Sequence, residues 1–272
     1  MRSGYLRESE GSVLIVTLWI LLVVAMLGIQ YSKMSRMESL LLIHGGERAK
    51  ARYAALAGVE KAAALLKFWN GKTPPEDEGN SAFWPLGSEV ELPPEGDVKV
   101  RVEVEDEGEK VNINIAKPEE IAEVLVDAGM DEDKALAIAD AIVDWRDRDN
   151  TRLPNGAEKG DYRAAGRDYS PPNRPFESIF ELPLVMGVDW ESFWEEPGLY
   201  HIFTIYGSKR KDSQNLPGLG EDNATAEEPF KLDEGEVYRF TVQAEATKIK
   251  ARVTAWLQYK GGRFHLLEKR VW

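Results

Sequence analysis

Apolar residues are most concentrated near the N-terminus, where they form one unbroken run. No charged residue occurs between Glu10 and Lys33, and Val13 to Ile29 reads VLIVTLWILLVVAMLGI. A helix of that length can span the hydrocarbon core of a bilayer. The end of the run, AMLGIQYSKM, lacks the small-residue cleavage site of an ordinary secretory signal. We therefore expect the segment to remain as a membrane anchor.

The predicted helix continues from the membrane into solvent and covers residues 12–70. Beyond the apolar run, apolar residues recur near helical spacing at Leu56, Val59, Ala63 and Leu66. This spacing predicts one apolar face that packs on a core. Gly45 and Gly46 make a bend plausible between the two parts of the helix.

Alternation of apolar and polar residues predicts β-strands farther along the chain. In DVKVRVEVEDE the alternating apolar positions are Val98, Val100, Val102 and Val104. EVYRFTVQAEA, KIKARVTAWLQYK and RFHLLEKRVW read as antiparallel strands, and the glycines of KGGR suit a tight hairpin. The Pro/Gly/acid-rich segment 71–97 predicts an ordered loop with short extended pieces. A long helix packed on an antiparallel sheet is an α+β fold.

Residues 111–199, between these strands, show helical periodicity instead. KPEEIAEVLVDAG begins with Pro118 in a first-turn position and stops at Gly129, and DEDKALAIADAIVDWRD follows. PFESIFELPLVMG and VDWESFWEEPG repeat this plan of helix, glycine turn and helix. We therefore predict a large all-α insert resembling paired helix-hairpin-helix units. It would interrupt a sheet domain made of residues 71–110 and 200–272.

Charge and composition exclude several classes of function. The formal net charge of −13 disfavours binding to nucleic acid or to anionic surfaces, and the absence of cysteine excludes disulfides and zinc ribbons. The three histidines, His44, His201 and His265, stand far apart, and no GxGxxG, P-loop or GxSxG motif occurs. We expect no enzymatic activity.

A DNA-binding module is the main alternative for the insert. The segment from VNINIAKPEE to AIVDWR resembles the helix-hairpin-helix modules of membrane-anchored DNA uptake proteins, which bind phosphates through a Gly-x-Gly hairpin. In this hairpin, AGMDEDKA, the second glycine is missing, and Asp131, Glu132 and Asp133 lie where a phosphate would approach. Lys134 alone does not offset three carboxylates. A hairpin used for protein packing is favoured.

The acidic segment DWRDRDNTRLPNGAEKGDY is the strongest candidate for a ligand site. In a twelve-residue window, the ligand positions of an EF-hand calcium loop fall on Asp147, Asp149, Thr151, Leu153, Asn155 and Glu158. Arg152 occupies the turn position that requires Gly, and no exit helix is evident after Glu158. A true EF-hand is therefore disfavoured, but calcium bound in an irregular loop fits these residues. The alternative is a solvated loop neutralised by Arg146, Arg148, Arg152 and Lys159.

Two segments of the chain, the N-terminal leader and the acidic segment, resemble one family. A short leader ends in Gly11 directly before the apolar helix, as in type IV pilins and pseudopilins. The acidic segment and the following PPNRPFESIFELPLVMG resemble the K-type minor pseudopilins of the type II secretion system, the GspK family. The resemblance implies a pilin-like fold with an α-domain inserted into it.

The resemblance also implies how the N-terminus is processed. A prepilin peptidase would remove the leader, residues 1–11, and methylate Ser12. The family's usual Glu at the fifth mature position, which neutralises the amine of the subunit ahead, is replaced here by Val16. A subunit without that Glu needs none ahead of it, as expected at the tip of a filament.

Partners, location and cofactor are implied in the same way. The chain would join the I- and J-type minor pseudopilins at the pseudopilus tip, help to initiate assembly and support protein export across the outer membrane. It would cross the bacterial inner membrane once, with its C-terminal domain in the periplasm, and bind no nucleic acid. Calcium would bind in the α-domain, with ligands carried over to Asp147, Asp149, Glu158 and Asp161, and with Asp144 and Thr151 as further candidates. Mg²⁺ is less suited to such a loop.

Overall fold

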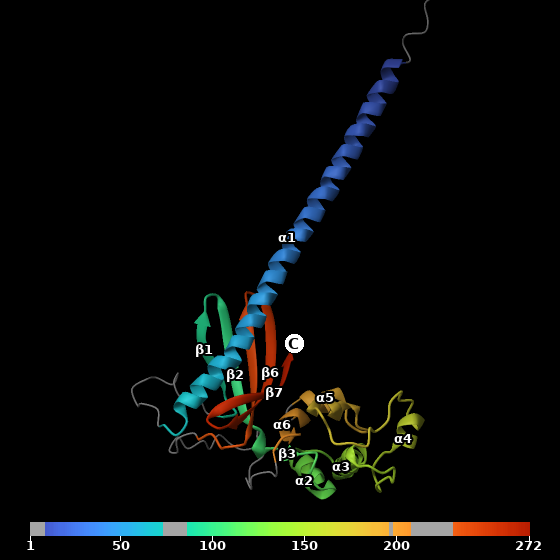
Figure 1. Ribbon diagram of the computed structural model, residues 1–272. Helices are drawn as coiled ribbons and strands as arrows, with labels where there is room; N and C mark the ends of the chain where they lie inside the picture. The colour runs from blue at the N-terminus through green and yellow to red at the C-terminus, as the bar shows by residue number, and fades with distance from the viewer. Residues whose placement is uncertain (1–8, 73–85, 196–197, 208–230) are drawn as a thin grey trace, which may run out of the picture.

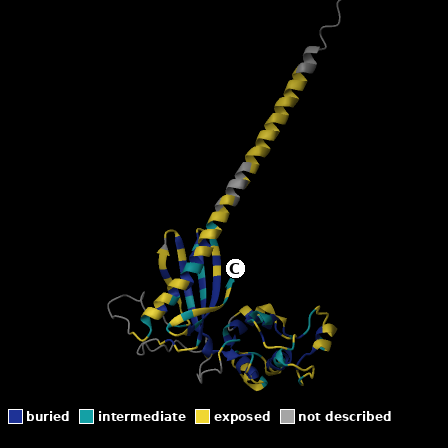
Figure 2. Cartoon of the chain, viewed as in Figure 1, coloured by how far each residue is buried: buried dark blue, intermediate teal, exposed yellow. Residues whose placement is uncertain are grey.

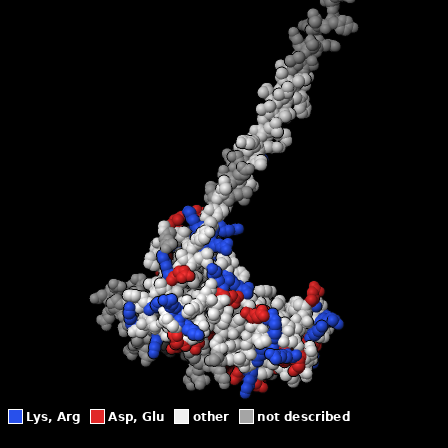
Figure 3. All heavy atoms as spheres, in the orientation of Figure 1, with Lys and Arg blue, Asp and Glu red and all other residues white. Residues whose placement is uncertain are grey.

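The long N-terminal helix α1 (Ser9–Trp69) confirms the predicted helix and runs through Gly45 and Gly46 without interruption. The computed structural model describes residues 9–72, 86–195, 198–207 and 231–272, so residues 1–8 of the predicted leader lie outside it. Within α1, Leu14–Met34 is long and apolar enough to cross a membrane, and none of it is buried. This outer part projects away from the rest of the chain (Figure 1) and is exposed (Figure 2). Figure 3 shows that the charged side chains of this face gather instead on the sheet and the insert.

The sheet has five strands in the order β1-β2-β5-β6-β7, and every neighbouring pair is antiparallel. The strands are β1 (Glu89–Glu95), β2 (Val98–Asp106), β5 (Val237–Ala246), β6 (Ile249–Lys260) and β7 (Arg263–Val271). The predicted hairpin at KGGR is confirmed, and its two glycines have φ values of 60° and 70°. The segment expected to be a loop with extended pieces forms β1 at the sheet edge. Two prolines are tolerated there because an edge strand has an unpaired side.

The inner half of α1 packs on one face of this sheet. A buried stripe along the helix, Ala51, Ala55, Val59, Ala62 and Leu66, meets the alternating valines of β2 and the apolar residues of β5 and β6. Gly58 lies at the closest approach. A Cβ atom built there would be 2.7 Å from Cγ1 of Val242 and 2.9 Å from Cγ1 of Val100. Small residues therefore set the distance between helix and sheet.

The insert between β2 and β5 is mostly helical. Its helices are η1 (Glu107–Glu109), α2 (Pro118–Asp127), α3 (Glu132–Arg146), α4 (Lys159–Ala164), η2 (Ile179–Leu184), α5 (Trp190–Trp194) and α6 (Leu199–Ile202). The strands β3 (Val111–Asn112) and β4 (Phe203–Thr204) pair in parallel where the chain enters and leaves the insert. An all-α description is therefore too simple, and α6 crosses residue 199, the predicted end of the insert.

The two predicted helix pairs differ in regularity. α2 and α3 form a hairpin around Gly129, whose φ is 87°, and the carboxylate of Asp131 caps α3 by accepting from the backbone N–H groups of Asp133 and Lys134. The prediction of the second helix pair is wrong in detail. η2 is a 3₁₀ segment with Pro183 inside it, and α5 has only five residues. Proline removes a backbone donor, which disfavours a longer α-helix there.

A buried pair of charged residues joins the insert to the sheet face opposite α1. Arg239 on β5 is 1% exposed, and its Nε and Nη2 donate to the two carboxylate oxygens of Glu105 on β2, each at 2.8 Å. Its Nη1 donates to the backbone oxygen of Tyr200 on α6 at 2.7 Å, and the guanidinium lies 3.9 Å from the centre of the Tyr200 ring. One arginine therefore contacts two strands and the insert.

A second pair completes this charge cluster. Nζ of Lys110 lies 2.7 Å from Glu107 Oε1 and 3.2 Å from Glu105 Oε1, and Oγ1 of Thr204 on β4 donates to Glu107. Two cations thus balance two carboxylates inside the protein. Burial by itself would raise the pKa of Glu105, but Arg239 and Lys110 hold that pKa well below its usual range.

Replacing Gly58 with Ala is expected to push α1 off the sheet and to lower the free energy of unfolding by about 1–3 kcal/mol. Chemical denaturation of the full chain in detergent micelles measures this. The matched control is Gly45→Ala in the same helix, where nothing lies within 4 Å of the added Cβ. Alanine there should be neutral or slightly stabilising. Equal losses in both variants would contradict the close-approach argument.

Replacing Arg239 with Met is expected to cost about 3–5 kcal/mol of stability, because it leaves Glu105 buried without its main partner. Arg101→Met is the control, since the Arg101–Glu89 pair is 40% and 46% exposed and surface pairs contribute little.

The pH dependence of unfolding gives a second readout of this variant. The contribution of Glu105 should be complete above its unfolded pKa of about 4.3 and be lost as the pH falls through its lower folded pKa. The Arg239→Met variant should show less of this acid-side loss. An unchanged profile would mean that Arg239 does not hold Glu105 ionised.

Candidate metal centre

The acidic segment forms a loop, residues 147–158, between α3 and α4, and α4 lies at the end of the insert farthest from α1 (Figure 1). The expectation that no helix follows Glu158 is wrong. α4 begins at Lys159 because Asp161 Oδ2 accepts from the backbone N–H of Glu158 at 2.9 Å and so caps the helix. The arrangement is therefore helix, twelve-residue loop and short helix.

Two buried aspartates one turn apart on α3 hold the loop in place. Both carboxylate oxygens of Asp144 lie within 3.3 Å of the backbone nitrogen of Leu153, which donates to them. Oδ2 of Asp140 accepts from the backbone N–H and from the side-chain amide of Asn155, at 3.0 and 3.2 Å. The loop also depends on Gly156, because a Cβ atom there would lie 2.0 Å from Asp144 Oδ2.

Three carboxylates converge above this base: Asp147, Asp149 and Glu158. Each offers an oxygen, and the three oxygens lie within 4.8 Å of one another. Two ligands of one calcium ion, each about 2.4 Å from it, are at most about 4.8 Å apart, so the group can share an ion. Glu158 is 6% exposed, and both of its carboxylate oxygens are buried without a hydrogen-bond partner among the described residues. Burying an unpaired carboxylate is costly, so this geometry favours a bound cation.

The pKa shifts of the loop carboxylates also favour a bound cation. Burial, followed by the nearby charge of Asp144, raises the pKa of Glu158. Burial, followed by the charge of Asp149, raises the pKa of Asp147, and burial also raises that of Asp144. Both causes disfavour the ionised carboxylates. A divalent cation would reverse this effect because it would be the largest local charge.

The other predicted ligands have different contacts. Asp161 caps α4 and pairs with Arg152 at 3.1 Å, and the hydrogen bond from Glu158 is the main cause of its lowered pKa. The exposed Thr151 donates its backbone N–H to Asp149 Oδ1 at 2.7 Å and so orients that carboxylate. Asp144 braces the loop from below. Asp144 and Asp161 do not belong to the converging group of carboxylates.

The basic residues invoked for a solvated loop do not all reach it. Both terminal nitrogens of Arg146 donate to the backbone oxygens of Ile113 and Ala116, although its charge still lowers the pKa of Asp147. Arg152 pairs with Asp161 rather than with the converging carboxylates. Neither side chain forms a described ion pair with the three converging carboxylates, so these two arginines neutralise the group only in part.

An aromatic core supports the loop from the α4 side. The ring of Tyr162 on α4 packs against Trp145 of α3, with centroids 5.8 Å apart, and its hydroxyl accepts from the backbone N–H of Met186 at 2.8 Å. The side-chain amide of Asn173 donates to the backbone oxygen of Asp149. The carboxylates thus stand on a packed base, as a preorganised site requires.

Two features of this site were missed in the sequence. Asp140 has a readable signal, since it stands four residues before Asp144 on a helix and so shares its face. The spacing of Glu158 and Asp161 is that of a reciprocal helix cap and indicates the start of α4.

The residues predicted for processing lie at the other end of the molecule. Gly11 and Ser12 fall within α1, but their side chains lie outside the described part of the structure. Val16 lies in the apolar stretch and is 56% exposed.

Comparison with known proteins gives one family and one fold. Residues 105–194 match the family model described as "Type II secretion system (T2SS), protein K", a range that covers α2 to α5 and the acidic loop. No curated protein matches the chain.

Among solved structures, a chain from the crystal structure of the GspK-GspI-GspJ complex of the enterotoxigenic Escherichia coli type 2 secretion system is similar. It is 14% identical, the match covers 84% of this chain and 98% of that chain, and the TM-score is 0.55. At this identity the similarity shows the fold, which combines an N-terminal helix with an antiparallel sheet.

Proposed function

Because the chain belongs to the protein K family of the type II secretion system and is a minor pseudopilin, we propose that it acts at the tip of the pseudopilus and helps to initiate its assembly. The match across residues 105–194 is the observation that carries this proposal. The similar fold of a chain in the GspK-GspI-GspJ complex supports I- and J-type minor pseudopilins as its partners. The hairpin does not favour the DNA-binding alternative. Its Asp131 carboxylate already accepts the backbone N–H groups at the start of α3, and the acidic Glu132 and Asp133 follow it.

The proposed position at the tip rests on the apolar helix and on the insert. The uncharged stretch of α1 contains Val16 where pilins carry a Glu, so this subunit offers no carboxylate to the amine of another subunit ahead of it. The insert stands on the sheet face opposite α1 and adds bulk that would hinder a further subunit above it. We infer that the protein is anchored in the inner membrane before assembly, with its C-terminal domain in the periplasm. Its work is assembly, with no bond made or broken after maturation.

We propose calcium as the ligand of the acidic loop, held by Asp147, Asp149 and Glu158. The unpaired, buried carboxylate of Glu158 supports this most strongly. Calcium accepts irregular sets of carboxylate and carbonyl oxygens, whereas Mg²⁺ requires near-octahedral geometry and keeps its waters. The ion would neutralise the loop and make the outer end of the insert rigid, while Asp140, Asp144 and Asp161 hold the backbone around it.

Maturation is expected to yield a chain that begins at Ser12 with a methylated amine. Coexpression with a prepilin peptidase, followed by mass spectrometry of the intact protein, tests this. Gly11→Leu should block cleavage because the peptidase recognises a small residue before the cut. An uncleaved wild-type chain, or cleavage at another residue, would overturn the assignment of residues 1–11 as a leader.

Calcium is expected to raise the melting temperature of the full chain, since a ligand at about 100 times its dissociation constant contributes about 2.7 kcal/mol. Glu158→Gln should abolish that gain. Without calcium the same variant should be at least as stable as wild type, because it removes a buried, unpaired charge.

The control for this experiment is Glu177→Gln, which changes an exposed acid of the insert. This variant should keep both the wild-type rise in melting temperature with calcium and the wild-type stability without it. A calcium response that survives Glu158→Gln would remove Glu158 from the site. No response in wild type at millimolar calcium would remove the calcium site itself.

A further inference from the structure

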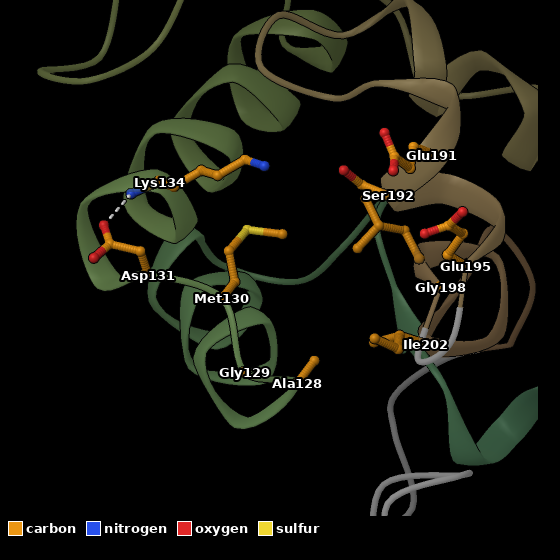
Figure 4. Close-up of a pocket in the computed structure, with 11 residues that line it drawn as sticks. Ala128, Gly129, Met130, Asp131, Lys134, Glu191, Ser192, Glu195, Gly198 and Ile202 are labelled. Atoms are coloured by element: carbon orange, nitrogen blue, oxygen red, sulfur yellow. Dashed lines mark hydrogen bonds between the residues drawn. The ribbon is translucent and has the colours of Figure 1, made fainter.

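A groove of about 400 Å³ lies between the α2–α3 hairpin and the α5–α6 segment (Figure 4), and no residue of the acidic loop lines it. Its apolar lining comes from both sides: Ala128 and Met130 of the hairpin, and Leu199 and Ile202 of α6. Met130 is partly exposed and its side chain points into the groove. Methionine is common on surfaces that adapt to apolar side chains of a partner, because it is flexible and polarisable.

The charged residues that line the groove are mostly acidic. Asp131 stands on the hairpin side and Glu191 and Glu195 on the α5 side, whereas Lys134 is the one cation among the described residues of the lining. Three carboxylates against one ammonium leave a net charge of −2. The carboxylate of Asp131 is held in place because it caps α3. The groove therefore combines an apolar floor with acidic walls.

The two glutamates lie one helical turn apart on the α5 side of the groove. Glu191 lies in α5, which has five residues, and Glu195 caps its end four residues later. Like charges at this spacing share one face of a helix and destabilise it. A positive charge placed between them would relieve the repulsion. The arrangement suits a cationic group in the groove better than an empty groove.

We propose that this groove docks a protein segment of another subunit that presents a lysine or arginine beside an apolar side chain. The apolar side chain would lie against Met130 and Ile202, and the cation would meet Glu191 and Glu195. The net charge of −13 on the whole chain would also attract such a segment. An anionic partner is disfavoured at the same place, although a hairpin of this shape can present backbone N–H groups to phosphate. The proposal adds a partner contact to the proposed function and does not depend on the metal loop.

The methyl group of Met130 provides a direct probe, because no other methionine in the described part of the chain lines the groove. Full chain labelled with ¹³C at the methionine methyls, in non-ionic micelles with millimolar calcium, would be titrated with the peptide acetyl-Lys-Leu-Lys-Leu-Lys-amide. The Met130 resonance should shift saturably. The same titration with acetyl-Glu-Leu-Glu-Leu-Glu-amide should leave it unchanged. Reversing the groove charge with Glu191→Lys and Glu195→Lys together should lower the affinity for the basic peptide at least ten-fold.

The matched control reverses two exposed acids with the same spacing on α2, outside the groove, by Glu119→Lys and Glu123→Lys together. This control should bind the basic peptide nearly as well as wild type. Calcium should raise the melting temperature of both double variants as much as that of wild type. The proposal is overturned if the basic peptide does not shift Met130, if the acidic peptide shifts it equally, or if the two double variants lose affinity equally. The last outcome would mean attraction to overall charge rather than docking.

Discussion

The insert and the sheet depend on one buried interaction, the pairing of Arg239 with Glu105. An arginine removed from water is stable only when its donors are satisfied, and here Glu105 of β2 and Tyr200 of α6 satisfy them together. Lys110, Glu107 and Thr204 extend the pairing to the strands that close the base of the insert. If the insert moved away, Arg239 would lose its hydrogen bond to Tyr200, and the charged pair would be exposed to water. Apolar packing holds the insert on the same face, since Val237 and Trp256 of the sheet belong to the buried core of the insert. Charge and apolar packing therefore hold the insert together, while α1 is held by apolar packing with Gly58 at its closest point.

The acidic loop shows the contrasting case of buried charge. In the cluster around Arg239, cations and carboxylates balance inside the protein. Around Glu158 three carboxylates converge, and both oxygens of Glu158 are buried without a hydrogen-bond partner among the described residues. The first cluster carries its own counter-charges, whereas the second is the one for which we propose a bound cation. This difference in charge balance separates a structural joint from a ligand site more reliably than the number of acidic residues does.

Sequence patterns predicted the regular elements well and the irregular ones poorly. Strict alternation in β2 and the glycine pair before β7 predicted strands and a hairpin because both effects are local. The α2–α3 hairpin was predicted from Pro118 and Gly129 for the same reason. The second helix pair was not, because Pro183 leaves only a 3₁₀ segment that aromatic packing around Phe180 supports. Asp161 stays a predicted metal ligand, and the structure adds that its side chain caps α4.

The sequence alone determined the apolar helix, the half-buried strands and the acidic composition of the loop, because hydrophobic periodicity and charge can be read residue by residue. It also placed Asp147, Asp149 and Glu158 in one segment. The tertiary structure decided which carboxylates meet, which ones brace or cap the backbone, and which of the buried charges are neutralised. Those outcomes depend on contacts between residues distant in the chain, such as Glu105 with Arg239, and such contacts exist only after the chain has folded.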